Sequence, residues 1–432
     1  MIHFKKPGLA FILLFLIFYG CIKVAESPSA MPTSSAIRFY GSNYGNFLNS
    51  FEATADGGFM FGGYTFSSAG QEDQGFIQKT DDGGNVLWYK TYGGPAVDIF
   101  ASVHTTSDGG YIAAGATNSY GNGSASERND FFFDAYLLKA DANGKLLWQK
   151  NFGGILDDRF FDVAETPDHG FIAVGIYNSN TYNCVYIVKT DHNGDSLWTK
   201  QVFANSTFFF SLGAAVTTAT NGNNAVAGYV AKSDASADQS TNYPSFILLS
   251  ASGQSLDSQN TTSPYPEYKT WGTLPYIYYG NYATSYNPEK IISRTDGYIL
   301  AINLPSAGPN GIMLFKVDIK GNVIWNHEYF GLSSAQMNSI SNNAAGGLLI
   351  SGGTTDVSGI SNIWLLNTDV NGNKLWENNI PLNGFNAWAA GAVATGNSFA
   401  VGVNLISTNK NHEGFFGLLN IDQNGKIVEI TK

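Results

Sequence analysis

Polar side chains recur at one point of the chain's repeating pattern, and they are the first candidates for chemistry. Asp98 and Asp158 each follow a Gly-Gly pair by four residues, at the expected start of a strand. Asn46 and Asn386 occupy similar places. Such side chains would either hold a ligand or cation at the mouth of a channel or cap the loops that carry them. The spacing leaves both alternatives open.

Four turns resemble the beginning of a calcium-binding loop. The string Asp-x-Asn-Gly recurs at Asp141, Asp191, Asp369 and Asp422. A calcium loop of this kind needs a glutamate at its twelfth position, where the first three copies have apolar residues and the fourth has none. The aspartates are therefore interpreted as turn residues, each followed by a glycine that supplies a positive φ.

Histidine and cysteine form no known metal or nucleophile motif. The six histidines make no His-x-x-x-His pair, and the two cysteines make no Cys-x-x-Cys pair. The chain has no Gly-x-Ser-x-Gly string, and its glycine-rich strings lack the lysine of a phosphate loop. We therefore predict no metal site and name no catalytic residue. His169 and His192 lie in expected turns and are interpreted as solvated.

Composition excludes several classes of protein. The chain has 432 residues, a net charge of -11, 14% aromatic residues and only 13% charged residues. An aromatic content this high buries too much surface for a disordered chain. The 49 glycines follow no three-residue period, which excludes collagen. An acidic chain without a basic block is a poor binder of phosphate backbones, so no nucleic acid partner is expected.

The first segment reads as a targeting signal. Residues 1–20 carry Lys5 and Lys6 and then a short apolar run that ends in Gly20-Cys21, which suits a signal peptide and is too short to span a bilayer. The site resembles the processing site of bacterial lipoproteins, which implies a lipid on Cys21. Loss of two lysines with the leader would move the net charge from -11 to -13. Residues 21–35 read as a flexible tether.

One repeat accounts for the remainder of the chain. Its sign is the string Asp-x-x-Gly-x-x-x-Trp, a turn followed by a strand that contains the tryptophan, and two degenerate copies end at Asp257 and Glu429. The tryptophans, expected to anchor the units structurally, are Trp88, Trp148, Trp198, Trp325 and Trp376. Successive copies are 60, 50, 59, 68, 51 and 53 residues apart. A period of about 57 residues that repeats hairpin signals indicates a propeller or solenoid.

Each unit contains four short runs of strand-forming residues separated by Asp-Gly and Asn-Gly turns. Residues 36–432 are therefore predicted to form one all-β domain, a seven-bladed β-propeller of four-stranded antiparallel blades. Residues 37–41 match the end of the tryptophan strand, so we expect the ring to close near both termini. Whether this segment replaces or supplements the strand at 427–431 is left open.

The repeat resembles two known groups. Asp-x-x-Gly-x-x-x-Trp after an alternating strand is similar to quinoprotein-like propeller repeats. The fuller string, from Asp-Gly-Gly-Tyr-Ile-x-x-Gly to the Gly-Gly pair after the tryptophan strand, resembles tandem propeller repeats of secreted and surface lipoproteins of Bacteroidetes. The quinone-dependent members of the first group use adjacent cysteines. This chain has only Cys184 besides Cys21, so no cofactor is expected.

Loop lengths carry the functional signal. In each unit, the turns from the first strand to the second and from the third to the fourth stay short. The long insertions fall in the second-to-third loops and in the links between units, and one of them, at about 257–288, is rich in aromatic residues. Polar aromatic side chains can stack on sugars or anchor a partner, or they can pack an irregular fourth blade. The candidate binding residues are Tyr265, Tyr268, Trp271, Tyr276, Tyr278 and Tyr279.

These observations predict a cell-envelope protein rather than an enzyme. A lipid at Cys21 would tether the propeller to the membrane as an outer-membrane lipoprotein, either periplasmic or surface-exposed. The long loops would bind a glycan, a peptide or a membrane-complex partner. The alternative is a glycan lyase or hydrolase that uses Asp98 or Asp158 at the channel mouth.

Overall fold

The computed structural model describes most of the chain after residue 35. The described residues are 36–41, 45–65, 73–121, 132–179, 181–202, 208–233, 240–256, 269–270, 290–304, 311–330, 335–408 and 414–428. They form 29 strands and no helix. None of them therefore belongs to a helix long and apolar enough to cross a membrane.

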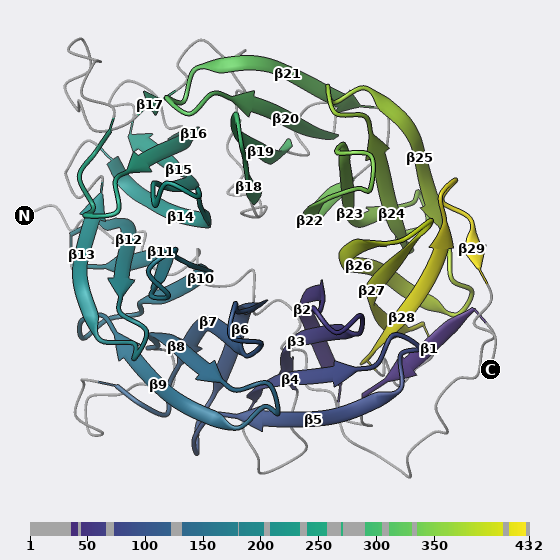
Figure 1. The fold of residues 1–432 in the computed structure, drawn as a ribbon, viewed down its shortest axis with the longest axis horizontal. Helices are drawn as coiled ribbons and strands as arrows, with labels where there is room; N and C mark the ends of the chain where they lie inside the picture. Colours follow the sequence, from purple (N-terminus) through teal and green to yellow (C-terminus); the bar gives the residue numbers. More distant parts are fainter. Residues whose placement is uncertain are drawn as a thin grey trace, which may run out of the picture.

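Seven antiparallel sheets stand around a central axis like the blades of a propeller (Figure 1). The prediction of a seven-bladed all-β propeller is confirmed. Blade 1 contains β2 (Asn46–Ala53), β3 (Phe59–Thr65), β4 (Gln74–Thr80) and β5 (Val86–Tyr92). Blade 2 contains β6 (Asp98–Thr105), β7 (Tyr111–Thr117), β8 (Asp134–Ala140) and β9 (Leu146–Phe152). Blade 3 contains β10 (Arg159–Glu165), β11 (Phe171–Asn178), β12 (Asn183–Thr190) and β13 (Ser196–Val202).

The remaining blades follow the same order from the axis outward. Blade 4 contains β14 (Phe208–Thr218), β15 (Asn224–Ser233), β16 (Ser240–Leu249) and β17 (Lys269–Thr270). Blade 5 contains β18 (Lys290–Arg294), β19 (Gly297–Leu304), β20 (Gly311–Val317) and β21 (Val323–Phe330). Blade 6 contains β22 (Gln336–Asn342), β23 (Leu348–Thr355), β24 (Ser361–Thr368) and β25 (Lys374–Ile380). Blade 7 contains β26 (Phe385–Thr395), β27 (Ser398–Ser407), β28 (Gly414–Asp422) and β29 (Ile427–Val428), together with β1 (Ile37–Tyr40).

The ring closes with one strand from each end of the described chain. β29 pairs with β28 at Asn420 and Ile421, and β1 continues along the same edge from Leu419 to Phe416. The outer strand of blade 7 is thus assembled from two segments placed end to end. The N-terminal segment therefore supplements the C-terminal strand, which answers the question left open by the sequence.

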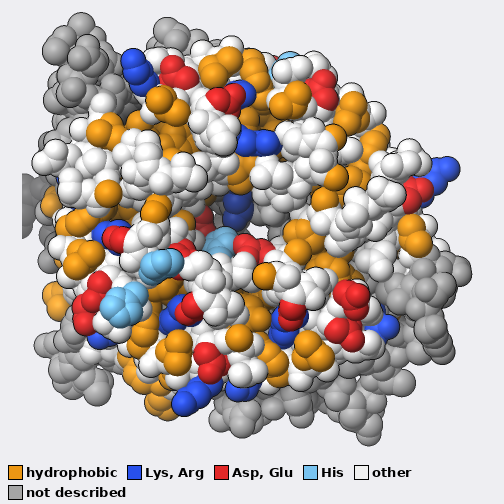
Figure 2. All heavy atoms as spheres, viewed as in Figure 1, with side chains coloured by type: hydrophobic (Ala, Val, Ile, Leu, Met, Phe, Trp, Pro, Cys, Tyr) orange, Lys and Arg blue, Asp and Glu red, His pale blue; other side chains and the backbone are white. Residues whose placement is uncertain are grey.

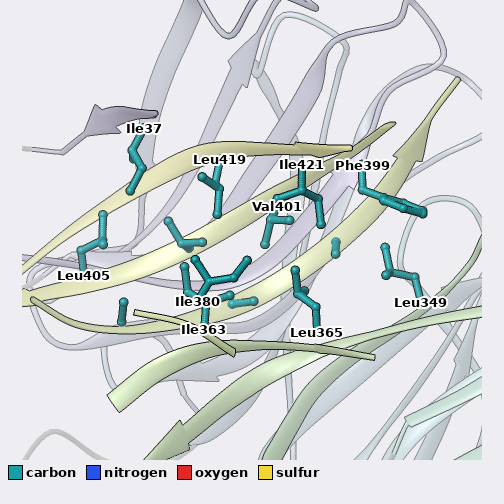
Figure 3. Close-up of a cluster of buried hydrophobic side chains, with 14 of the residues drawn as sticks. Ile37, Leu349, Ile363, Leu365, Ile380, Phe399, Val401, Leu405, Leu419 and Ile421 are labelled. Atoms are coloured by element: carbon teal, nitrogen blue, oxygen red, sulfur yellow. The ribbon is translucent and has the colours of Figure 1, made fainter. Parts of the chain in front are cut away.

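The core lies between the blades because each sheet buries both faces of its middle strands. β7 and β8 are buried along their whole length, whereas the outer strand β9 begins with two exposed residues. Figure 3 shows the same packing between blades 6 and 7, where Ile363 and Leu365 of β24 face Val401 and Leu405 of β27. Burial of these aliphatic side chains between adjacent sheets is the main force that holds neighbouring blades together.

The two faces of the ring differ. One face, here called the short-turn face, carries the turns that join the first strand of a blade to the second and the third to the fourth. Twelve of these turns share one pattern of two hydrogen bonds. The N–H of the first residue donates to the carbonyl four residues later, and the N–H of the fourth residue donates back to the carbonyl of the first. The opposite face, here called the long-loop face, carries the second-to-third loops and the links between blades.

The insertion expected at about 257–288 contains one short strand among the described residues. Lys269 and Thr270 lie at the outer edge of blade 4 as β17, where they pair with Phe246 and Ser245. An exposed edge of β16 would favour pairing with other chains, and this short strand covers part of it.

Candidate functional site in the central channel

Asp98 lies at the start of β6, as expected, but its carboxylate is fully buried. It accepts hydrogen bonds from Thr117 Oγ1, from Ser119 Oγ at 2.7 Å and from the backbone N–H of Gly94 at 2.7 Å. Burial raises the pKa of Asp98, and these three donors oppose that effect. The carboxylate therefore ties the link from blade 1 to the loop that follows β7.

Asp158 makes the same kind of contact one blade later. Its two oxygens accept from the N–H of Gly154 at 2.6 Å and from the N–H of Asn178 at 2.7 Å, and the residue is fully buried. Burial raises the pKa of Asp158 to about 6. A ligand in the channel would reach neither aspartate without breaking these loop caps, so no observation favours the glycan-enzyme alternative.

The two asparagines of the predicted set lie at the start of the innermost strands of blades 1 and 7. Asn46 is buried and its Oδ1 lies 3.4 Å from the Tyr89 hydroxyl. Asn386 is partly exposed, and its Oδ1 accepts from the N–H of Ser361 at 2.9 Å. The four predicted channel-mouth residues therefore lie at similar places in four blades and are not brought together. Each makes a hydrogen bond within the protein, although the buried Nδ2 of Asn46 has no partner among the described residues.

The five repeat tryptophans lie between neighbouring blades. Each indole rests on the glycine of the next blade's third-to-fourth turn, where a side chain would clash with the ring; for Trp88 this is Gly144, with φ +71°. The indole N–H of Trp148 donates to the carbonyl of His192 at 3.0 Å. The tryptophans thus fasten consecutive blades at their outer strands.

Several predicted residues lie outside the described part of the chain. They are Cys21 and the aromatic candidates Tyr265, Tyr268, Trp271, Tyr276, Tyr278 and Tyr279. Their predicted roles stay predictions.

The central channel is lined by the innermost strand of each blade (β2, β6, β10, β14, β18, β22 and β26). Six of these strands contain a bulge. In β2 the bulge is at Asn49, and in β10 it is at Phe161. A bulge frees backbone groups from the ladder and redirects side chains. At the β2 bulge, the side-chain amide of Asn49 donates a hydrogen bond to the carbonyl of Phe100 in the next blade at 2.7 Å.

A charged cluster on the channel wall joins three adjacent blades. His104 of β6 lies between two carboxylates: its Nδ1 is 2.6 Å from Glu52 Oε1 on β2, and its Nε2 is 2.8 Å from Asp162 Oδ1 on β10. Asp162 also accepts from the N–H of Val216 in blade 4 at 2.9 Å. Figure 2 shows histidine, acidic and basic side-chain atoms gathered around the hollow at the ring's centre.

Electrostatics keep all three groups of this cluster charged. Burial lowers the pKa of His104, but the charge of Glu52 and the hydrogen bonds to both carboxylates outweigh it and raise the pKa to about 10. Burial raises the pKa of Glu52 and Asp162, yet the His104 imidazolium holds both below their ordinary values. At neutral pH the cluster is therefore an imidazolium between two carboxylates, with a net charge of -1.

The sequence did not point to this cluster, although a signal was present. Glu52 and His104 each precede by two residues the threonine that opens the first turn of their blade, Thr54 and Thr106. Equal distance from equivalent turns places the two side chains at the same level in adjacent blades. Asp162 lies four residues before its threonine, Thr166, two residues further from the turn than His104, so the same rule did not predict its contact with the imidazole.

The described residues contain no group of three or more His, Cys, Asp or Glu side chains arranged to hold a metal ion. The cluster itself is a linear chain of hydrogen bonds whose two imidazole nitrogens are both occupied by carboxylates. An imidazolium has no lone pair for a metal. Its chemistry is that of a polar wall able to contact a ligand in the channel.

Comparison with known proteins gives similarity of fold alone. No protein-family model and no curated protein matches the chain. Among solved structures, the Pan2 WD40 domain of Neurospora crassa is 9% identical, with a TM-score of 0.45 over 90% of this chain and 92% of that one. Sqt1 of Chaetomium thermophilum is 10% identical, with a TM-score of 0.47 over 90% and 98%. A puromycin hydrolase is 12% identical, with a TM-score of 0.48 over 89% of this chain and 53% of that one. At these values no argument about function rests on the similarity.

Proposed function

We propose that this chain is a binding module of the bacterial cell envelope, tethered by a lipid at Cys21. Its propeller would capture a glycan, a peptide or a subunit of a membrane complex on the long-loop face. The observation that carries the proposal is the difference between the two faces of the ring.

The short-turn face repeats one turn geometry, whereas the long-loop face varies from blade to blade. The second-to-third loop has 16 residues in blade 2, four in blade 3 and five in blade 6. Variable loops on a rigid scaffold are typical of binding surfaces.

Substitutions in the long loops are expected to weaken capture of the partner by about tenfold or more, as for residues at the centre of an interface. We would immobilise residues 22–432, identify the retained envelope component by mass spectrometry and measure its affinity for purified Trp271→Ala and Tyr278→Ala. The matched control is Val370→Ala, which removes an exposed side chain from a turn on the short-turn face. Equal weakening by the control, or normal affinity in both long-loop variants with reduced stability, would contradict the proposal.

The anchor is tested separately. Replacing Cys21 by Ser should move the protein from the membrane fraction to the soluble fraction, because the thiol is the group that would carry the acyl chains. Cys184→Ala is the matched control, since Cys184 is the chain's other cysteine and is buried in β12. Mass spectrometry of the mature wild-type protein should find acyl chains on Cys21. An unmodified Cys21 would remove the anchor from the proposal while leaving the binding module intact.

A further inference from the structure

The innermost strands of three adjacent blades carry two partly exposed phenylalanines and two opposite charges. β14 lies between β10 and β18 and contacts both strands. Phe161 of β10 and Phe210 of β14 are partly exposed and pack with Leu212 and Tyr229 in one cluster. Both phenylalanines are the third residue of their strand, on the side of the channel nearer the long-loop face.

Lys290 supplies the positive charge at the same wall. Lys290 lies three residues before Ser293, which pairs with Tyr298 in blade 5. Asp162 lies three residues before Glu165, which pairs with Phe171 in blade 3. These two pairs are equivalent in blades 5 and 3, so Lys290 and Asp162 stand at the same level of the channel. The positive charge of Lys290 contributes to the lowered pKa of Asp162.

Lys290 forms no ion pair with any residue that the structure describes. The Lys290 ammonium and Asp162, which belongs to the cluster of net charge -1, therefore lie at the same level of the channel without forming an ion pair. A channel with low-dielectric walls concentrates the field of such a pair and attracts a ligand with complementary charges. The ligand must bring an anionic group to Lys290 and a hydrogen-bond donor to Asp162.

We propose that the channel binds the free carboxyl end of a peptide whose last residue is apolar. The terminal carboxylate would pair with Lys290, the last amide N–H would donate to Asp162, and the side chain would pack against Phe161 and Phe210. Capture of a terminal carboxylate is an established mode of peptide recognition in which backbone N–H groups hold the carboxylate. Here the Lys290 ammonium would hold it. The inference rests on the proposed binding function and names the chemistry of its partner.

Peptides with a blocked terminus test the assignment. The probes are fluorescein-labelled hexapeptides ending in Phe or Leu, each made with a free carboxylate and as the terminal amide, with binding followed by fluorescence anisotropy. We expect amidation to weaken binding at least tenfold in the wild type, and Lys290→Met to weaken the free acid by a similar factor. Amidation should then have little further effect in Lys290→Met, because both changes remove the same contact. Lys290→Arg should stay within about threefold of the wild type, because it keeps the positive charge.

The matched control is Lys200→Met, which removes one positive charge from an outer strand far from the axis. It should bind like the wild type, and thermal unfolding should show that each variant is folded. Absence of peptide binding at millimolar concentration, or equal binding of acid and amide, would overturn the inference. Lys290-dependent binding of trigalacturonate without peptide binding would also overturn it and assign the channel to an acidic saccharide. Normal capture by Lys290→Met together with loss in Trp271→Ala would overturn the channel assignment alone and leave the proposed function in place.

Discussion

A chain that begins at Gly41 is expected to unfold at a much lower denaturant concentration than a chain that begins at Ala36. The difference between the two is β1, whose Ile37 and Tyr40 are each 5% exposed. Burial of two such side chains contributes about 3–6 kcal/mol, since each is worth roughly 1.5–3 kcal/mol. Urea unfolding of both chains, followed by tryptophan fluorescence, measures the difference in free energy.

The contacts of Tyr40 explain why this strand matters to the whole ring. Its ring lies 5.1 Å from that of Phe61 in blade 1 and 5.5 Å from that of Phe416 in blade 7. Its hydroxyl donates to the carbonyl of Gly84 at 2.6 Å. Tyr92 makes the equivalent bond to Gly144 at 2.7 Å. Tyr40 thus provides at the closure of the ring the contact that other blades make within the continuous chain.

Tyr92 therefore offers a matched control for the closure. Tyr40→Phe and Tyr92→Phe each remove one buried hydroxyl, and each is expected to cost about 1 kcal/mol. Removing β1 also uncovers an edge of β28, so the shorter chain should associate at high concentration. Equal midpoints for the chains starting at residues 36 and 41 would show that β29 alone closes the ring.

The fold was predictable from the sequence because the repeated residues are the ones that form the turns and the contacts between blades. The tryptophan, the turn glycine and the aspartate that opens the turn recur together, and each makes a contact that a propeller requires. The arrangement at the closure was not predictable, because Glu429 stands where a tryptophan would mark the register of the last strand. Only the pairing of β1 and β29 with one neighbour shows that they share the edge.

The candidate site was predictable only in part. The sequence placed Asp98 at the start of an innermost strand, but its donors Thr117 and Ser119 come from another strand and loop, so the burial of its carboxylate was not visible. Equal distance from the first turn brings Glu52 to His104, but Asp162 lies two residues further from its turn and still reaches the imidazole. Local patterns do not predict such an offset, because it depends on contacts between blades.

Replacing His104 by Leu is expected to lower the free energy of unfolding by about 2–3 kcal/mol at pH 6. The change removes the cation between Glu52 and Asp162 and leaves two carboxylates on the channel wall without a compensating positive charge. Breaking a fully buried pair costs about 3–5 kcal/mol, and the value here is smaller because 33% of the His104 side chain is exposed. Urea unfolding measures the loss. His192→Leu, in an exposed turn, should stay within about 0.5 kcal/mol of the wild type.

The pH dependence of this loss distinguishes the lost charge from lost packing. The raised pKa of His104 means that its contribution is complete below pH 6.5 and disappears as the pH rises through about 10. The lowered pKa of Glu52 and Asp162 means that their contribution is present above their ordinary values of 4.5 and 3.8 and disappears in acid. The gap between His104→Leu and the wild type should therefore be largest between about pH 4.5 and 6.5 and shrink on both sides. Adding Glu52→Gln to His104→Leu should recover part of the stability, because one uncompensated charge is removed. A gap that is constant with pH and unaffected by Glu52→Gln would mean that His104 acts by filling space, not by holding the three blades through its charge.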